Sequence, residues 1–423
     1  MTIRAISLFS SGGIGDLALK NNNIDILVAN ELIKDRAQVF MKNYPETKMI
    51  IGDINTEKDN IIKTTKQILK GRPLDVLYAT PPCQGMSKNG RGKLLQGIRN
   101  GKKPVVDIRN KLIIPTIEIT KKLNPETLIL ENVPEMENTL IDVDGNMVNI
   151  IDYIKLSLPN YTGRCEVVEF ANYGVPEKRQ RLITIFTRNK KLQAHFSKNN
   201  TFLPPQTHAE HPTLLSKKWI TLRETISNLP PLDAKNKITA TSDIPFHRVP
   251  ILDKDKYFWV SNTPAECGAF DNQCIHCGCQ NNPTHKSKKN VLGINKASED
   301  TPLYCRQCGQ ILPRPWIHDK NGYRLMKGFT SAYRRMKWDS PCNTLTRNLS
   351  YACSDSKLHP EQNRVLSLYE AFLVHTITDF IYNWQRMDGK KLSDNVIRDI
   401  IGESIPPRGL YIIVQYILKI MTS

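Results

Sequence analysis

The sequence contains no apolar run near the ~20 residues that a membrane-spanning helix needs, and no signal peptide is recognisable at its start. These absences predict a soluble protein of the cell interior, where cysteines stay reduced. Internal repeats and a long disordered tail are missing as well. Acidic side chains are outnumbered, with 41 Asp and Glu against 59 Lys and Arg, and the formal net charge is +18. Such a surplus favours binding to nucleic-acid phosphates, although abundant Lys, Asn and Ile are also typical of an AT-rich genome.

The chain opens with a pattern typical of nucleotide-cofactor binding. An apolar strand over residues 3–9 runs into the glycine-rich turn 10–16, and a helix follows from Leu17. Glycines allow a ligand to approach the backbone closely, and the first turn of a helix offers unpaired N–H groups. One such turn is weak evidence by itself. At 423 residues the chain is long enough for an α/β domain of this kind and for a second domain.

Acidic side chains follow the next two predicted strands. Glu31 comes after a strand over residues 26–30, and Asp53 comes after a strand over residues 49–52. A carboxylate at such a strand end commonly accepts hydrogen bonds from ribose hydroxyls. Either residue is equally compatible with a solvated loop acid.

A cysteine and a third carboxylate follow two later strands. Cys83 lies just beyond the apolar run 74–78, with prolines before it and a glycine after it, and Glu131 ends the apolar run 127–130. Ligands of open α/β sheets bind at strand ends, so a thiol held there has the position of a nucleophile. The peptide alone is equally compatible with a buried, inert cysteine in a tight turn.

Two arginines precede the predicted strand 182–186. Arg179 and Arg181 stand at alternate positions, which places them on one strand face. They are either ligands for a planar acceptor or charges at the edge of a strand.

In this order, the blocks resemble those of the cytosine-5 DNA methyltransferase family over nearly the whole chain. The matching blocks are the turn around Phe9 and Gly13, the acids Glu31 and Asp53, Pro82-Cys83-Gln84, Glu131-Asn132-Val133, Arg179 with Arg181, residues 359–367, and residues 402–407. The resemblance implies a Rossmann-like α/β methyltransferase domain that depends on S-adenosylmethionine, together with a smaller target-recognition domain.

The resemblance also assigns catalytic roles. Cys83 would add to carbon 6 of cytosine and make carbon 5 nucleophilic. Glu131 would meet the N3 and amino edge of the base, a role that requires a raised pKa. Arg181, with Arg179 beside it, would hold the carbonyl oxygen of the base or an adjacent phosphate. The base must leave the duplex stack to reach these groups.

The implied methyl donor is S-adenosylmethionine, with its ribose on Glu31, its adenine near Asp53 and Ile54, and its methionine end near Phe9 and Gly13. The full set of cofactor-binding residues implied by the resemblance is Phe9, Ser11, Gly13, Ile14, Glu31, Leu32, Asp53, Ile54, Pro82 and Ser404.

Several positions depart from the family pattern, and one of these departures, Ile14 followed by Gly15-Asp16, is a tolerated variant. Ser11 stands where a glycine is usual, Glu177 where a glutamine is usual, and Glu403 where an asparagine is usual. The two glutamates add negative charge where contacts to cofactor, loop or DNA are expected.

Two Cys-x-x-Cys-Gly knuckles predict a structural zinc ribbon over about residues 267–313. Their thiols belong to Cys274, Cys277, Cys305 and Cys308, and four thiolates in a closed tetrahedron would leave no open position for catalysis. A redox pair or metal-free reduced cysteines are the alternatives. Nearby substitutes for a ligand are His276, Cys279, Cys267 and His285.

The predicted domains are a catalytic domain over residues 1–188, a target-recognition domain with the ribbon over 189–395, and a final helix over 396–423 that returns to the catalytic domain. The predicted function is methylation of cytosine carbon 5 in a specific duplex DNA sequence, as the modification enzyme of a restriction-modification system with a possible cognate endonuclease. We expect a monomer in the cytoplasm of a prokaryotic cell, or of viral or phage origin, held at the nucleoid through DNA. The alternatives are a tRNA or other RNA cytosine-5 methyltransferase and a catalytically silent DNA-binding module.

Overall fold

The computed structural model describes residues 2–82, 108–284, 287–289, 295–297, 301–326 and 331–422, with backbone alone at 287–289 and 295–297. These residues confirm the predicted α/β fold. They contain a seven-stranded sheet in the order β3-β2-β1-β4-β5-β10-β8. Its strands are β1 (Ile3–Leu8), β2 (Ile24–Glu31), β3 (Lys48–Ile51), β4 (Val76–Ala79), β5 (Thr127–Asn132), β8 (Thr162–Glu169) and β10 (Gln180–Thr187).

Five strands of this sheet, β3, β2, β1, β4 and β5, are parallel, while β10 lies antiparallel between β5 and β8. Parallel strands end at the same edge of a sheet. The turn after β1, the acid that ends β2, the prolines after β4 and the acid in β5 are therefore brought to one edge, where ligands of open α/β sheets bind.

Both faces of the sheet are buried, because apolar side chains occupy successive positions and strand residues alternate between faces. Ile6 and Leu8 pack on one face, with helices α3 (Ile54–Leu69), α5 (Ile113–Leu123) and α6 (Ile150–Ser157). Ala5, Tyr78 and Ile183 pack on the other, with α1 (Asp16–Lys20), α7 (Lys190–Lys198) and α12 (Pro407–Thr422). The helix α2 (Lys34–Asn43) covers the ends of β2 and β3.

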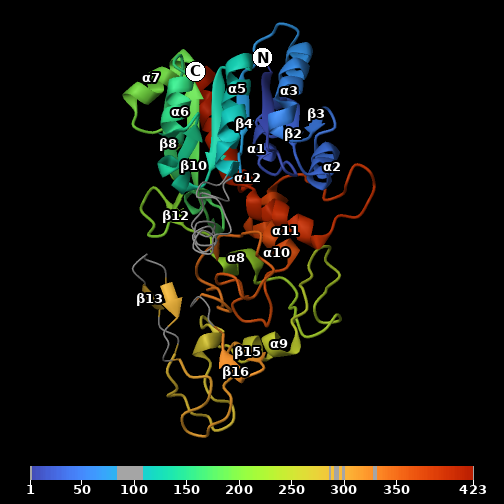
Figure 1. Ribbon diagram of the computed structural model, residues 1–423, viewed down its shortest axis with the longest axis vertical. Coiled ribbons are helices and arrows are strands. Elements are labelled where there is room, and N and C mark those ends of the chain that lie inside the picture. Colours follow the sequence, from blue (N-terminus) through green and yellow to red (C-terminus); the bar gives the residue numbers. More distant parts are fainter. Residues whose placement is uncertain are drawn as a thin grey trace.

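A second part of the molecule lies below the sheet (Figure 1). It is poor in regular structure, and its helices are α8 (Leu222–Ile226), α9 (Lys254–Ser261), α10 (Leu368–Val374) and α11 (Asp394–Glu403). The remaining short strands of the chain are β6 (Leu140–Val143), β7 (Asn146–Asn149), β9 (Glu177–Lys178), β11 (His208–Ala209), β12 (Lys217–Lys218), β13 (Ser287–Lys289), β14 (Asn295–Ala297), β15 (Trp316–Asp319), β16 (Gly322–Leu325) and β17 (Cys342–Asn343).

The two parts share one apolar cluster. Ile14 of the first turn and Val39 of α2 pack with buried side chains of α8, α10 and α11. The chain then returns to the sheet through α12, whose Leu410, Ile413 and Ile417 join the sheet core. The domain boundary at residue 188 stays a prediction, although α7 packs in the same core as α12.

Within the described ranges, none of the helices combines the length and apolar character required to cross a lipid bilayer.

Candidate active site and candidate metal centre

The turn after β1 has a backbone that ordinary side chains rarely adopt. Phe9, Ser11 and Gly13 have φ values of 60°, 48° and 82°, all in the left-handed region. A side chain at Gly13 would overlap the Tyr44 ring, which packs against this turn and donates its hydroxyl to the Gly13 carbonyl at 2.5 Å. Tyr382 donates in the same way to the carbonyl of Gly12. The turn is therefore held in one shape from two sides.

Glu31 closes this turn from the end of β2. Its carboxylate accepts hydrogen bonds from the backbone N–H groups of Ser11 and Ile33, each at 2.8 Å. Burial raises the pKa of Glu31 in spite of these bonds and of nearby Arg36. Leu32, the next residue, is 63% exposed, so its apolar surface is free to contact a ligand. These positions fit the expected cofactor edge, and their roles stay predictions.

Asp53 also acts as a helix N-cap, a role that was not predicted from the sequence. Its side chain caps α3 by accepting from the N–H of Asn55 at 2.8 Å, and Ile54 behind it is buried. The buried amide of Asn30 donates to the carbonyls of Ile50 and Gly52 and so fixes the end of β3 beside the end of β2. The cap and the amide together keep Asp53 at the same edge as Glu31.

Glu131 and Arg181 form an ion pair between β5 and β10. The Arg181 Nε lies 2.8 Å from Glu131 Oε1, and both side chains are largely buried. Burial raises the pKa of Glu131, although the charges of Arg181 and Arg179 oppose that shift. The carboxyl therefore takes up a proton more readily than an ordinary glutamate does, which is what contact with the N3 edge of a cytosine requires.

The described segment that leads to Cys83 lies beside Asn132, the neighbour of Glu131 in β5. Asn132, next to Glu131, donates its amide to the carbonyl of Pro81 at 3.0 Å, which fixes Pro81 and Pro82 close to the acid. Cys83 itself lies outside the described residues.

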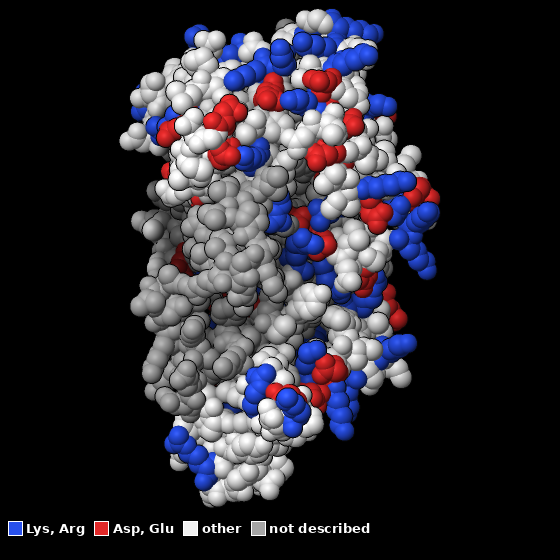
Figure 2. Space-filling view, in the orientation of Figure 1, with Lys and Arg blue, Asp and Glu red and all other residues white. Residues whose placement is uncertain are grey.

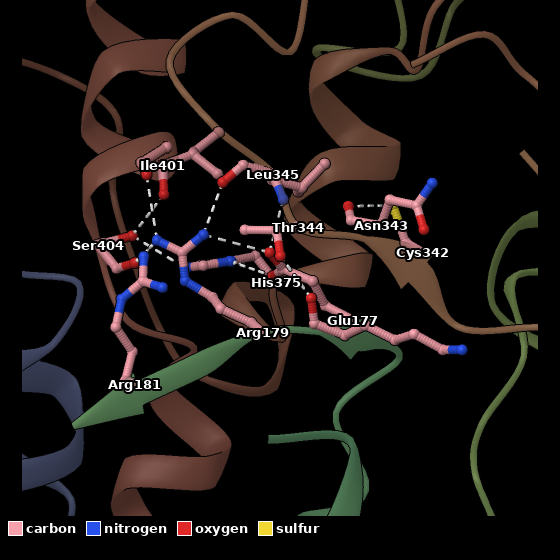
Figure 3. A network of polar contacts seen from close by, with 12 residues as sticks. Glu177, Arg179, Arg181, Cys342, Asn343, Thr344, Leu345, His375, Ile401 and Ser404 are labelled. Carbon is pink, nitrogen blue, oxygen red and sulfur yellow. Dashed lines mark hydrogen bonds and ion pairs between the residues drawn. The ribbon is translucent and has the colours of Figure 1, made fainter. Parts of the chain in front are cut away.

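Arg179 differs from the expectation that it contacts a substrate. It is fully buried, and its guanidinium donates to Glu177 Oε1 at 3.3 Å, to the Leu345 carbonyl at 2.6 Å, and to the carbonyls of Gly402 and Ser404 (Figure 3). Its hydrogen bonds thus go to the Glu177 carboxylate and to three backbone carbonyls, whereas Arg181 of β10 lies against Glu131.

The segment 402–404 is held against the linker that follows β17. Gly402 approaches the Thr346 and Arg347 backbone so closely that a Cβ atom would overlap it. Glu403, one of the departures from the family pattern, is bracketed by Arg36 Nη1 at 2.5 Å and Arg347 Nη1 at 3.2 Å. Its extra negative charge is therefore neutralised locally. Neither arginine was singled out from the sequence.

The four cysteines of the two knuckles converge on one point. All four Sγ atoms lie within 4.8 Å of one another, with Cys274 and Cys308 at 3.6 Å and Cys277 and Cys305 at 3.7 Å. Zn–S bonds of about 2.3 Å in a tetrahedron place sulfurs about 3.8 Å apart, whereas a disulfide needs about 2.05 Å. The spacing fits a metal and excludes a disulfide.

The backbone of each knuckle favours a thiolate at its first cysteine. N–H groups of His276 and Cys277 lower the pKa of Cys274, and those of Gln307 and Cys308 lower the pKa of Cys305 to about 6. Thiolates are the form that binds metal. Among the described residues, His276, Cys279 and Cys267 do not join the cluster of four, and His285 lies outside those residues.

A buried arginine, Arg314, connects the backbone segments that flank the two knuckles. Arg314 donates to the carbonyls of Asn272, Pro283 and Pro302 at 2.8 to 2.9 Å, so it joins the segments before and after the knuckles. Arg314 could not be singled out from the sequence, because one arginine among many forms no pattern.

Comparison with known proteins establishes which family this chain belongs to. The sequence model of the family described as C-5 cytosine-specific DNA methylase matches residues 3–419. This chain belongs to that family. The family recognised from the sequence is thereby confirmed, and so is the enzymatic activity: the methylase transfers a methyl group to carbon 5 of cytosine in DNA, and its methyl donor is S-adenosylmethionine.

Two curated relatives and two solved structures show how far the similarity extends. The methylase is 30% identical over 415 residues to Type II methyltransferase M1.HgaI of Avibacterium volantium, covering 96% of this chain and 95% of that protein. It is 26% identical over 341 residues to Type II methyltransferase M.NgoPII of Neisseria gonorrhoeae, covering 79% and 82%. DNMT2 of Spodoptera frugiperda has a TM-score of 0.53 at 15% identity, with 100% of both chains covered. Dnmt2 of S. pombe has a TM-score of 0.53 at 13% identity, with 99% of this chain and 98% of that chain covered. The two structures share the fold.

Proposed function

We propose that this methylase recognises a short sequence in duplex DNA and methylates a cytosine there, as the modification enzyme of a restriction-modification system. The ion pair of Glu131 with Arg181, beside the start of the Cys83 loop, is the observation that carries the proposal. The names of the relatives, which are Type II methyltransferases, support the restriction-modification setting. A cognate endonuclease would then be the functional partner. The enzyme would act as a monomer on DNA in the cytoplasm of its host.

In the proposed reaction a cytosine is flipped out of the duplex into the pocket at the sheet edge. The Cys83 thiolate adds to carbon 6, while Glu131 protonates or hydrogen-bonds N3, so the ring electrons move to carbon 5. Arg181 holds Glu131 in place and offers its remaining N–H groups to the carbonyl oxygen of the base. Carbon 5 takes the methyl group, and loss of its proton then expels Cys83.

S-adenosylmethionine supplies an electrophilic methyl group. We assign its binding to the turn around Phe9, Ser11, Gly13 and Ile14 and to the strand ends that follow it, where Glu31, Leu32, Asp53 and Ile54 lie. Pro82 and Ser404 would line the methionine end. The fixed turn and the buried carboxylate of Glu31 support this assignment.

We also propose that Cys274, Cys277, Cys305 and Cys308 hold a structural Zn²⁺. The spacing of their sulfurs supports this ligand set. The metal would order the lower part of the molecule, which we propose as the target-recognition domain. Figure 2 shows Lys and Arg side chains gathered at mid-height, where the upper and lower parts meet, and this face would receive the DNA phosphates.

The test is transfer of labelled methyl groups to unmethylated duplex DNA and, in parallel, to tRNA, followed by mapping of the methylated bases. The proposal predicts label at carbon 5 of cytosine within one short DNA motif. Label on tRNA alone would assign the enzyme to RNA, and label on neither by a folded, cofactor-bound protein would reject methyl transfer.

A further inference from the structure

Glu177 is a fully buried carboxylate at the start of β9. Its Oε1 accepts the N–H of Leu345 at 2.7 Å and faces the guanidinium of Arg179 at 3.3 Å. Its Oε2 lies 2.7 Å from Nδ1 of His375, which is also fully buried. Both oxygens are therefore engaged, and the carboxylate is the form that these donors require.

His375 extends the contact to the cofactor side. Its Nε2 lies 2.9 Å from the hydroxyl oxygen of Ser404, which we assign to the cofactor pocket. Burial lowers the pKa of His375, and the carboxylate of Glu177 opposes that shift. The Ser404 hydroxyl donates its proton to the carbonyl of Ile401 at 2.9 Å. Its oxygen therefore accepts from Nε2 of His375 and keeps one lone pair for a ligand.

We propose that Glu177 and His375 are positioning residues for methyl transfer: Glu177 neutralises the buried Arg179 next to Glu131, and His375 connects that pair to Ser404. This inference rests on the proposed function of the same site and adds residues to it. Figure 3 shows the arrangement, in which Glu177, Arg179, His375 and Ser404 face one another between β10 and the start of α12.

The charge of Arg179 explains why a glutamate is useful at this position. The positive charge of Arg179 opposes protonation of Glu131, as that of Arg181 does. A carboxylate on the far side of Arg179 cancels part of this field, so Glu131 keeps its proton to higher pH. Among the described residues, the titratable or charged groups around Glu131 are Arg179, Arg181 and the Tyr78 hydroxyl. The groups recorded around Glu177 are Arg179, His375, Lys357, Cys342 and Glu169.

The first test is the pH profile of kcat for Glu177→Gln, an isosteric change that leaves Arg179 without its counter-charge. Because Glu131 acts in its protonated form, activity falls as pH rises through the pKa of Glu131. We expect this alkaline limb to move to lower pH by about one unit in Glu177→Gln, and to stay at the wild-type position in Glu177→Asp, which keeps the charge. Glu210→Gln is the matched control, since Glu210 pairs with Lys178 at the exposed surface nearby.

The second test is the affinity of His375→Gln for S-adenosylmethionine, measured by calorimetry. Loss of the hydrogen bond from His375 that fixes the Ser404 hydroxyl should weaken binding about fivefold, with the alkaline limb of kcat unchanged. An unmoved limb in folded Glu177→Gln would overturn the role of Glu177. If neither variant at position 177 folds, the affinity of His375→Gln for S-adenosylmethionine tests the proposal. An affinity equal to that of the wild-type enzyme would overturn it. A wild-type enzyme that methylates no DNA would instead reject the proposed function, so the two failures are distinguishable.

Discussion

The sheet edge and the cysteine-rich region of this methylase are stabilised in different ways. The sheet has two extensive apolar clusters, one on each face, and its reactive side chains project from strand ends that those clusters hold in place. Around the knuckles, by contrast, the buried cluster among the described residues consists of Cys274, Cys305 and Leu312. Hydrophobic burial therefore accounts for the geometry of the proposed chemical site, while the region that we assign to recognition depends on its four thiolates and on Arg314.

The largest effect should come from a change that removes chemistry and leaves both regions folded. Cys83→Ala is expected to reduce methyl transfer by at least about 10⁴-fold, since no other group supplies the attack on carbon 6. Affinity for S-adenosylmethionine and for target DNA should stay near the wild-type values. A single-turnover assay measures the first quantity and calorimetry the second; turnover at the wild-type rate would show that Cys83 is not the nucleophile.

Removal of the proposed metal should affect the cysteine-rich region and leave the sheet region intact. Chelation, or the change Cys305→Ser, is expected to disorder the knuckles and to reduce specific DNA affinity to the non-specific level, at least about 10³-fold lower. Binding of S-adenosylmethionine should persist because the sheet has its own core. Metal analysis together with DNA titration gives the answer, and Cys353→Ser is the control, because Cys353 is an exposed cysteine outside the cluster. Undiminished specific affinity after proven metal loss would contradict this role.

A buried acid offers a pH test confined to the sheet region. Burial raises the pKa of Asp16 from 3.8 to about 7, and one of its oxygens has no hydrogen-bond partner among the described residues. The folded protein keeps this proton up to about pH 7, whereas the unfolded chain releases it near pH 3.8. The unfolded state therefore binds fewer protons in this window, and stability falls as pH rises through it.

Asp16→Asn is accordingly expected to stabilise the protein at pH 8 by a few kcal/mol and to have little effect at pH 4. Denaturant unfolding of both proteins at the two pH values measures the difference. If Asp16→Asn changed the free energy of unfolding equally at pH 4 and pH 8, the protonation of Asp16 would not be the cause of the change.

The smallest effect concerns the cofactor. Glu31→Gln is expected to weaken binding of S-adenosylmethionine about tenfold, because a charge-assisted hydrogen bond to the ribose becomes a neutral one. DNA affinity should not change, since Glu31 lies in the sheet region. Parallel titrations with cofactor and with DNA measure both dissociation constants. A loss of DNA affinity without a loss of cofactor affinity would mean that Glu31 contacts DNA and not S-adenosylmethionine.

The sequence predicted the parts of the site that follow from strand ends. Glu131 and Arg181 stood out because each adjoins a clear apolar strand, and the resemblance to the family supplied their roles. The antiparallel register of β5 and β10 brings them together. The four knuckle cysteines were recognised from their spacing. In each case the signal lies within a few residues of the chain, where periodicity and spacing can be read.

His375 and Arg36 could not be predicted in the same way. His375 meets Glu177 across 198 positions, and Arg36 meets Glu403 across 367 positions. A single histidine at the end of an apolar helix has the pattern of an ordinary core residue, and its partner becomes evident only when α10 packs beside β9. For Arg179, strand alternation placed the side chain beside Arg181, but its burial depends on the returning segment at residues 402–404.

The most direct measurement uses a target duplex in which 5-fluorocytosine replaces the methylated cytosine. Fluorine at carbon 5 prevents the proton loss that would expel the enzyme, so the adduct should persist. The account predicts a covalent enzyme–DNA complex that forms only with S-adenosylmethionine present, and peptide mapping should locate the bond at Cys83. A bond at any other cysteine, or methylation of ordinary cytosine without a trapped complex, would contradict it.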